Sequence, residues 1–167
     1  GYLQSNNIET GELHWLVESP RKGALSSPVL FFDNNEPVVI TNTMGGDVLK
    51  IKARSGAIIW KNEMGKEYES YSSVAPIRFN GKSTNDIVTI FSRGVWPKYD
   101  SATLFILDGM TGERIFQEKI GFCNGASSPV IGDVDNDGLD DIVMVTCTER
   151  QPRLLVINNK LKKIFSQ

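Results

Sequence analysis

Three similar stretches of sequence, each able to form four short strands, constrain the fold of this chain more than any other feature. The stretches begin at Ser26, Ser72 and Ser127, so their starts lie 46 and 55 residues apart. Each start is followed by short runs of Val, Ile and Leu that are separated by Gly, Asn, Asp and Pro, which is the pattern of strands and turns. A four-stranded unit of about 45 residues is typical of a β-propeller blade.

The N-terminus fits the same repeat, because Gly11 and Trp15 align with Gly56 and Trp60 at an offset of 45 residues. The sequence therefore opens at the third strand of a blade and holds about 3.5 blades in its 167 residues. We predict an all-β fold, a partial β-propeller of four-stranded antiparallel blades. The expected units are a half blade with its connection (1–25) and three blades (26–71, 72–126 and 127–167).

The acidic turn at residues 133–141 is the strongest functional motif and reads D-x-D-x-D-G-x-x-D. Alternate Asp residues in a tight turn can converge on one Ca²⁺, a hard cation that takes about six to eight oxygen ligands. Gly138 gives the backbone the freedom that such a turn needs. The expected ligands are Asp133, Asp135, Asp137, the carbonyl of Leu139, and Asp141. The alternative is an Asp- and Asn-rich hairpin turn that holds no ion.

Two family resemblances follow from these motifs. Residues 127–143, Ser-Ser-Pro-Val-Ile-Gly-Asp-x-Asp-x-Asp-Gly-x-x-Asp-Ile-Val, resemble the FG-GAP repeat of integrin-α-type propellers. The Thr-Gly-Glu-x-x-Trp/Phe ends at 10–15 and 111–116 are similar to the repeats of pyrroloquinoline-quinone (PQQ)-like propellers, whose recurring tryptophan docks adjacent blades. The resemblance implies calcium in the last repeat only, because the hairpin at 32–37 is too short and Lys82 replaces an acid in the next one. It implies a fold and leaves the function open.

Aromatic residues recur four positions after the turn glycine of successive repeats, at Trp15, Trp60 and Phe116. Because the spacing follows the fold, we expect these side chains to pack one blade against the next. The alternative is an aromatic platform for a ligand.

The connection between the second and third strands is longest in the middle blade, where we expect an inserted loop at 92–101 in place of the short link at 43–46. Arg, Trp and Tyr are the residues most enriched at binding hot spots. The candidate ligand contacts are Arg93, Trp96 and Tyr99, with Tyr68 and Arg150 nearby on the same face. The alternative is an insertion that folds over the edge of its own blade and buries Trp96.

We expect no catalytic residues in this stretch. The only histidine, His14, lies in an expected fourth strand, where we expect a surface or packing role, so it does not support a Ser/His/Asp or Cys/His set. The vicinal Cys pair of quinoprotein dehydrogenases is also absent, since Cys123 and Cys147 lie 24 residues apart. Whether these two cysteines form a disulfide or remain buried free thiols stays open.

The charge and the hydropathy of the sequence argue against some classes of binding partner. With 20 acidic and 18 basic residues the net charge is −2, which argues against a nucleic-acid or anionic-membrane binder. No apolar run approaches the roughly 18 residues of a membrane span, and the opening residues lack the apolar segment of a signal peptide.

We therefore expect a non-enzymatic, calcium-stabilised scaffold for a protein or glycan ligand, in an extracellular or periplasmic protein. The missing blades would come from the same longer chain or from a second copy. Two alternatives remain: the propeller portion of a quinoprotein-like or polysaccharide-acting enzyme whose active site lies in other blades, and a fragment of a cell-adhesion receptor.

Overall fold

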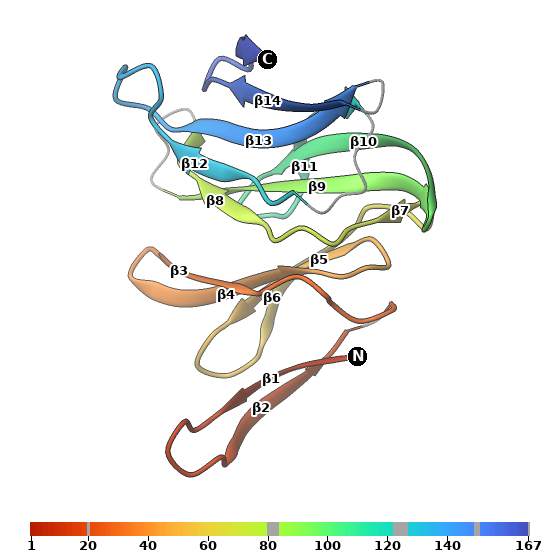
Figure 1. Cartoon of the computed structure of the whole chain (residues 1–167). Helices are drawn as coiled ribbons and strands as arrows, with labels where there is room; N and C mark the ends of the chain where they lie inside the picture. Colours follow the sequence, from red (N-terminus) through yellow and green to blue (C-terminus); the bar gives the residue numbers. More distant parts are fainter. Residues whose placement is uncertain (20, 80–83, 122–126, 149–150, 167) are drawn as a thin grey trace.

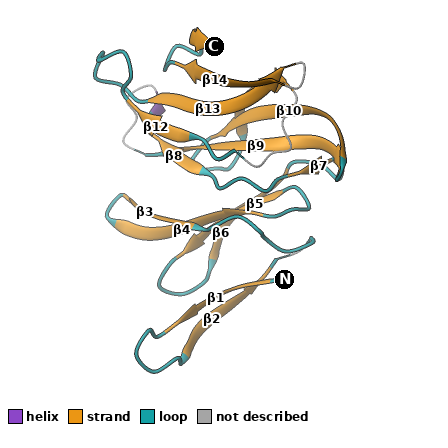
Figure 2. Cartoon of the chain, viewed as in Figure 1, coloured by secondary structure: helices purple, strands orange, loops and turns teal. Residues whose placement is uncertain are grey.

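A computed structural model of the chain describes residues 1–19, 21–79, 84–121, 127–148 and 151–166. These residues form strands and loops almost throughout (Figure 2). Within these ranges, no helix has both the length and the apolar character to cross a membrane.

The strands belong to four antiparallel sheets that follow one another along the chain and stack face to face (Figure 1). Sheet 1 pairs β1 (Tyr2–Asn6) with β2 (Leu13–Glu18). Sheet 2 has the order β3 (Val29–Asp33), β4 (Glu36–Asn42), β5 (Asp47–Lys52) and β6 (Ile58–Glu63).

Sheet 3 has the order β11 (Arg114–Gly121), β10 (Lys98–Leu107), β9 (Asp86–Val95) and β7 (Tyr68–Glu69), and β8 (Ala75–Ile77) also pairs with β9. Sheet 4 has the order β12 (Val130–Gly132), β13 (Asp141–Thr148), β14 (Gln151–Ile157) and β15 (Lys163–Ser166). The predicted fold class, an all-β partial propeller of four-stranded antiparallel units, is confirmed.

Residues 92–101 differ from the expected loop, because they continue β9 and β10 as a long hairpin that turns at Trp96-Pro97. The length of this connection, compared with the link at 43–46, suggested a loop in the sequence. However, Gly94 lies inside the strand at a φ of 117°, opposite Tyr99, and a Cβ there would come within 2.4 Å of the Lys98 carbonyl oxygen. Glycine therefore permits a close approach of the two strands instead of ending them.

Three apolar cores lie between consecutive sheets. The core between sheets 3 and 4 includes Ile90, Leu104, Ile142, Met144 and Leu155. The core between sheets 2 and 3 includes Ile40, Val48, Phe91 and Phe105, and the core between sheets 1 and 2 joins Val17 to Leu49 and Ile51. Each inner sheet is thus apolar on both faces, as expected for a stack of blades.

Tryptophan side chains connect one sheet to the next. Trp15 of β2 lies against Gly56 and donates its indole N–H to the Ala53 carbonyl oxygen at 2.8 Å. Trp60 of β6 repeats this arrangement one sheet later, against Gly112, with its N–H on the Gly109 carbonyl oxygen at 3.0 Å. A third aromatic residue, Phe116 of β11, is half-buried against the core between sheets 3 and 4.

Lys50 is a buried cation that sequence reasoning missed. It is only 2% exposed and faces sheet 3, with its Nζ 2.5 Å from Asp33 Oδ2 and 2.6 Å from the Gly109 carbonyl oxygen. The Gly109 N–H donates to Asp86 Oδ1 at 3.0 Å. Gly109 of sheet 3 is therefore held through its carbonyl oxygen by Lys50 and Trp60 of sheet 2, and through its N–H by Asp86 of its own sheet.

Candidate functional site

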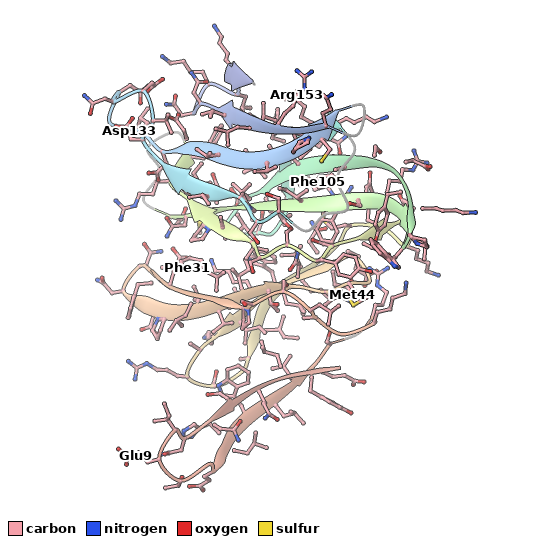
Figure 3. The ribbon with its side chains drawn as sticks, in the orientation of Figure 1. Glu9, Phe31, Met44, Phe105, Asp133 and Arg153 are labelled. Atoms are coloured by element: carbon pink, nitrogen blue, oxygen red, sulfur yellow. The ribbon has the colours of Figure 1, made fainter. Side chains whose placement is uncertain are left out.

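The acidic turn joins β12 to β13 and projects from one side of the stack, where Figure 3 labels Asp133. One carboxylate oxygen from each of Asp133, Asp135 and Asp141 lies within 4.8 Å of the other two. The structure thus brings together the first, third and ninth positions of the motif. This spacing suits oxygen ligands around a single cation.

Backbone hydrogen bonds shape the turn around Asp133. Its Oδ1 accepts from the Asp137 N–H at 3.1 Å, and its Oδ2 accepts from the Gly138 N–H at 2.9 Å. Asn136 and Gly138 both adopt left-handed backbone conformations, with φ values of 60° and 85°. Asn and Gly are the residues that tolerate this conformation best, so the local sequence favours the turn.

Asp141 is the buried member of the cluster, with 0% exposure at the start of β13. Its Oδ2 accepts from the Val134 N–H at 2.8 Å, whereas its Oδ1 has no hydrogen-bond partner among the described residues. A buried carboxylate oxygen without a partner is costly. A cation between the three carboxylates would satisfy it.

Asp137, a fourth expected ligand, lies outside this cluster of three carboxylates, and the role of the Leu139 carbonyl stays a prediction. The Asp137 carboxylate instead accepts from Asn159 Nδ2, at 3.1 and 3.3 Å, and from the Leu139 N–H at 3.0 Å. Asn159 lies in the turn between β14 and β15, so the acidic turn is tied to a second turn of sheet 4. Sequence reasoning missed Asn159, whose signal was the Asn158-Asn159 pair where the other repeats have Thr-Gly or Ser-Gly.

The electrostatics of the turn favour a bound cation. Loss of solvation, together with the neighbouring carboxylates of Asp137 and Asp141, raises the pKa of Asp135 above its usual value. A bound cation would offset the repulsion between these carboxylates and lower that pKa again.

The β9–β10 hairpin carries the predicted ligand contacts to the opposite side of the stack (Figure 1). Trp96 at its tip is 59% exposed and Val95 is 57% exposed, so the hairpin does not bury Trp96. Arg93 is also exposed. Tyr68, in contrast, is half-buried, with its ring edge-on to Phe105 at a centroid distance of 5.5 Å.

Glu69 binds the tip region of this hairpin and was missed in the sequence. It is 3% exposed, and its Oε2 accepts from the Trp96 N–H at 3.1 Å and the Tyr99 O–H at 2.9 Å. Its Oε1 is 2.5 Å from Lys22 Nζ. Burial opposes ionisation of Glu69, but the hydrogen bonds from Lys22, Trp96 and Tyr99 prevail and lower its pKa. Burial and the hydrogen bonds with Tyr71 and Glu69 raise the pKa of Tyr99.

Two predictions fall on residues outside the described ranges, namely the ligand contact Arg150 and the Cys123 half of the possible disulfide. Cys147 lies half-buried in β13.

Comparison with known proteins supports the fold. No family profile matches the sequence, and no curated protein matches it. Among solved structures, BamB from Moraxella catarrhalis aligns with 99% of this chain, at 18% identity and a TM-score of 0.61. The PilY1 C-terminal domain from Pseudomonas aeruginosa aligns with 93%, at 17% identity and a TM-score of 0.68. Quinohemoprotein alcohol dehydrogenase ADHIIG from Pseudomonas putida HK5 aligns with 100%, at 13% identity and a TM-score of 0.60.

The chain spans only part of each of these structures: 46% of the BamB chain, 36% of the PilY1 chain and 31% of the dehydrogenase chain. At these identities the likeness shows a shared architecture, that of PQQ-like propellers, and no shared activity.

Proposed function

We propose that this chain is a calcium-stabilised, non-enzymatic β-propeller scaffold that displays a binding hairpin to a protein or glycan, within a larger extracellular or periplasmic protein. The observation that carries the proposal is the buried Asp141, which clusters with Asp133 and Asp135 and whose Oδ1 has no hydrogen-bond partner among the described residues. Three carboxylates so close together are stabilised by a cation and destabilised without one.

Calcium suits this site better than the other common cations. The donors are all carboxylate oxygens, which hard cations prefer, and no His or Cys belongs to the cluster among the described residues. Two members, Asp133 and Asp135, are exposed in a turn and can adjust to the irregular shell of Ca²⁺, whereas Mg²⁺ demands a near-ideal octahedron. Extracellular calcium modules bind at roughly 10⁻⁴–10⁻³ M, which supports an extracellular or periplasmic location.

The hairpin supplies the proposed contact surface. Glu69 accepts hydrogen bonds from the Trp96 N–H and the Tyr99 hydroxyl, so the backbone that bears the exposed Trp96 ring is held in place. A preorganised aromatic side chain loses little entropy when a partner binds, which favours a hot-spot role. Calcium and ligand would then act on opposite sides of the stack.

Thermal unfolding with and without calcium tests the metal part of the proposal. We expect Ca²⁺ to raise the melting temperature of the parent and a chelator to lower it, with a smaller effect of Mg²⁺ at equal concentration. Asp135→Ala should abolish the calcium response, whereas Asp100→Ala, which removes an exposed acid elsewhere, should retain it. An unchanged melting temperature of the parent in chelator would exclude the calcium role.

The structural match to a quinohemoprotein alcohol dehydrogenase favours a second candidate, the propeller portion of a quinone-dependent enzyme. In that case, the catalytic groups would lie in other blades of the polypeptide. Titration of the protein with pyrroloquinoline quinone, followed by absorbance, distinguishes the two: saturable micromolar binding would favour the enzyme.

A further inference from the structure

A cavity of about 320 Å³ lies where the connection from sheet 1 to sheet 2 meets the connection from sheet 2 to sheet 3. We call it the basic cleft; it is lined by Arg21, Lys22, Gly45, Lys66, Tyr68 and Glu69. We propose that the basic cleft binds a uronate residue of an acidic glycan, whose next sugar lies on Trp96. This inference rests on the proposed role of the hairpin as a contact surface, and it names the class of ligand.

The cations of the cleft retain donors for an anion. Arg21 binds the Asp47 carboxylate through Nε and Nη2, at 2.6 to 3.2 Å, and its Nη1 makes no hydrogen bond to another described residue. Lys66 is exposed and forms no ion pair within the described ranges. Lys22 directs its Nζ to Glu69 at 2.5 Å, and an ammonium group has three donors. Three cations and one acid thus line the cleft, a balance that favours a carboxylate ligand.

Arg21 is held in place before any ligand arrives. Asp47, its partner, is 0% exposed, so it fixes the guanidinium from inside the protein without lining the cleft. A Cβ on Gly45 would lie 2.3 Å from the Arg21 Cβ, so glycine at this position lets the β4–β5 turn approach Arg21 closely. A cation ordered in this way loses little conformational entropy when it binds an anion.

An acceptor and an aromatic ring beside the cations favour a sugar over an acidic peptide. The Glu69 carboxylate accepts from Lys22, Trp96 and Tyr99, and a carboxylate has roughly four acceptor sites, which leaves one for a sugar hydroxyl. The half-buried Tyr68 ring offers an apolar wall to the C–H face of a sugar. A peptide carboxylate would use the cations alone. The volume of the cleft is at the small end of ligand pockets, roughly 300–1,000 Å³, which suits a single sugar ring.

The cleft continues toward the tip of the β9–β10 hairpin. Tyr68 and Glu69 form β7, which pairs with β9 on the side of the stack where the hairpin turns (Figure 1). Tyr68 lies opposite Arg93, and residues directly opposite in an antiparallel pair point to the same face, so the exposed Arg93 adds a cation there. Glu69 binds both Lys22 and the Trp96 N–H, so one side chain joins the cleft to the residue that carries the exposed ring.

Isothermal titration calorimetry of the full natural polypeptide tests the inference, with short oligomers of galacturonate and of glucuronate at constant calcium. The methyl esters of these oligomers keep the sugar rings but lack the charge. Lys66→Glu reverses a charge in the cleft without breaking an ion pair among the described residues. The matched control, Lys52→Glu, makes the same change at an exposed position at the other end of β5 from Asp47. Circular dichroism establishes that each variant is folded.

We expect saturable binding of at least one uronate oligomer, and binding of its methyl ester weaker by about tenfold or more. Lys66→Glu should weaken uronate binding by about tenfold or more, whereas Lys52→Glu should leave the constant within about twofold. Equal losses in the two variants, equal affinity for the ester, or no uronate binding would overturn the inference. Binding of an aspartate-rich peptide in place of the uronates, with the same dependence on Lys66, would overturn the choice of a glycan.

Trp96→Ala separates this inference from the proposed function on which it rests. We expect it to weaken uronate binding as well, because the next sugar loses the ring. Binding that depends on Lys66 but not on Trp96 would support the cleft and contradict the hairpin as a contact surface. Binding that depends on Trp96 but not on Lys66 would support the hairpin and overturn the cleft.

Discussion

Asp141 differs from the exposed acids of the turn, Asp133 and Asp135, because its carboxylate is buried from water. The exposed acids Asp133 and Asp135 would tolerate an empty turn, since solvent can satisfy their oxygens. Asp141 is fully buried, and its Oδ1 has no hydrogen-bond partner within the described ranges, so the cost of bringing these carboxylates together without a cation falls largely on this residue. The effects of substitution within the motif should therefore differ from one acid to another.

At the residue scale, Asp133→Asn and Asp137→Asn should distinguish an acid that binds the cation directly from one that only supports the turn. Asp133 contributes an oxygen to the cluster, whereas the Asp137 carboxylate is held by Asn159. We expect Asp133→Asn to weaken calcium binding by about tenfold or more, which corresponds to about 1.4 kcal/mol, and Asp137→Asn to weaken it by less. Isothermal titration calorimetry measures both constants; equal losses would place Asp137 among the ligands.

A second residue-scale prediction concerns the acid stability of the hairpin. The pKa of Glu69 is lowered below its usual value of 4.5, so the ionised form stabilises the folded state above that pH. As the pH falls below about 4.5 and through the lower folded-state pKa, this contribution is lost. Melting temperatures measured between pH 6 and pH 3 should fall less steeply for Glu69→Gln than for the parent.

The exposed neighbour provides the control for this experiment. Glu67→Gln removes an acid two residues away that is exposed to solvent, and it should retain the parental pH dependence. A Glu69→Gln profile parallel to that of the parent would show that Glu69 does not carry the effect.

At the scale of the elements, the spacing of Gly and Trp predicted the strands because backbone geometry imposes it. The turn glycines at 11, 56 and 112 have φ values of 74°, 72° and 75°, which few other residues adopt. Where the fold depends on a long-range contact, the sequence carried less information. The long segment at 92–101 suggested a loop although it continues two paired strands, and one partner of Lys50 lies 59 residues away at Gly109.

The same limit applies to the site. The D-x-D-x-D-G-x-x-D spacing predicted five ligands, and three of these residues, Asp133, Asp135 and Asp141, lie together because a tight turn brings residues that are near in sequence together. The spacing did not distinguish them from Asp137. The roles of Asn159 and Glu69 depend on which turns and strands meet in space. No local pattern encodes those meetings.

Two glycine substitutions isolate the docking of one sheet on another. Gly11 and Gly112 occupy the same position in equivalent turns of two sheets, with φ values of 74° and 75°. A Cβ added to Gly11 would have no neighbouring atom within 4 Å, whereas one added to Gly112 would lie 2.6 Å from the Trp60 ring. Gly11→Ala should cost only the strain of a left-handed alanine, about 1–2 kcal/mol. Gly112→Ala should cost about 1–3 kcal/mol more, since Trp60 must also move. Urea unfolding of both variants measures the difference, and equal costs would show that Trp60 moves freely.

At the scale of the whole molecule, several apolar side chains of sheet 4 are exposed to solvent in the part of the chain that the structure describes. Val130, Val145 and Leu154 are 64%, 44% and 41% exposed, and Val145 pairs with Leu154 across β13 and β14. Stacked sheets bury such faces against a neighbour. The 167-residue chain on its own should therefore associate through this surface.

Light scattering across a concentration series tests this prediction. The mass of the parent should rise above the 18.5 kDa of one chain, and the double variant Val145→Thr/Leu154→Gln should remain closer to that value. Ile8→Gln, which changes an isolated exposed side chain in a turn, should behave like the parent. A parent that remains at 18.5 kDa at every concentration would contradict the prediction.

The backbone hydrogen bonds of Gly109 affect how this molecule unfolds. Stacked repeats can unfold one at a time when each contact between neighbours is weak. Here the Gly109 carbonyl accepts from Lys50 and Trp60 of sheet 2, while its N–H is held by Asp86 of its own sheet. Sheet 2 cannot separate from sheet 3 without taking both donors from this carbonyl and leaving Asp33 as the one remaining partner of Lys50 among the described residues, and sheet 3 cannot open without losing the turn that presents the carbonyl. The two sheets should therefore form one cooperative unit, and hydrogen–deuterium exchange of their most protected amides should give the same free energy of opening in both sheets.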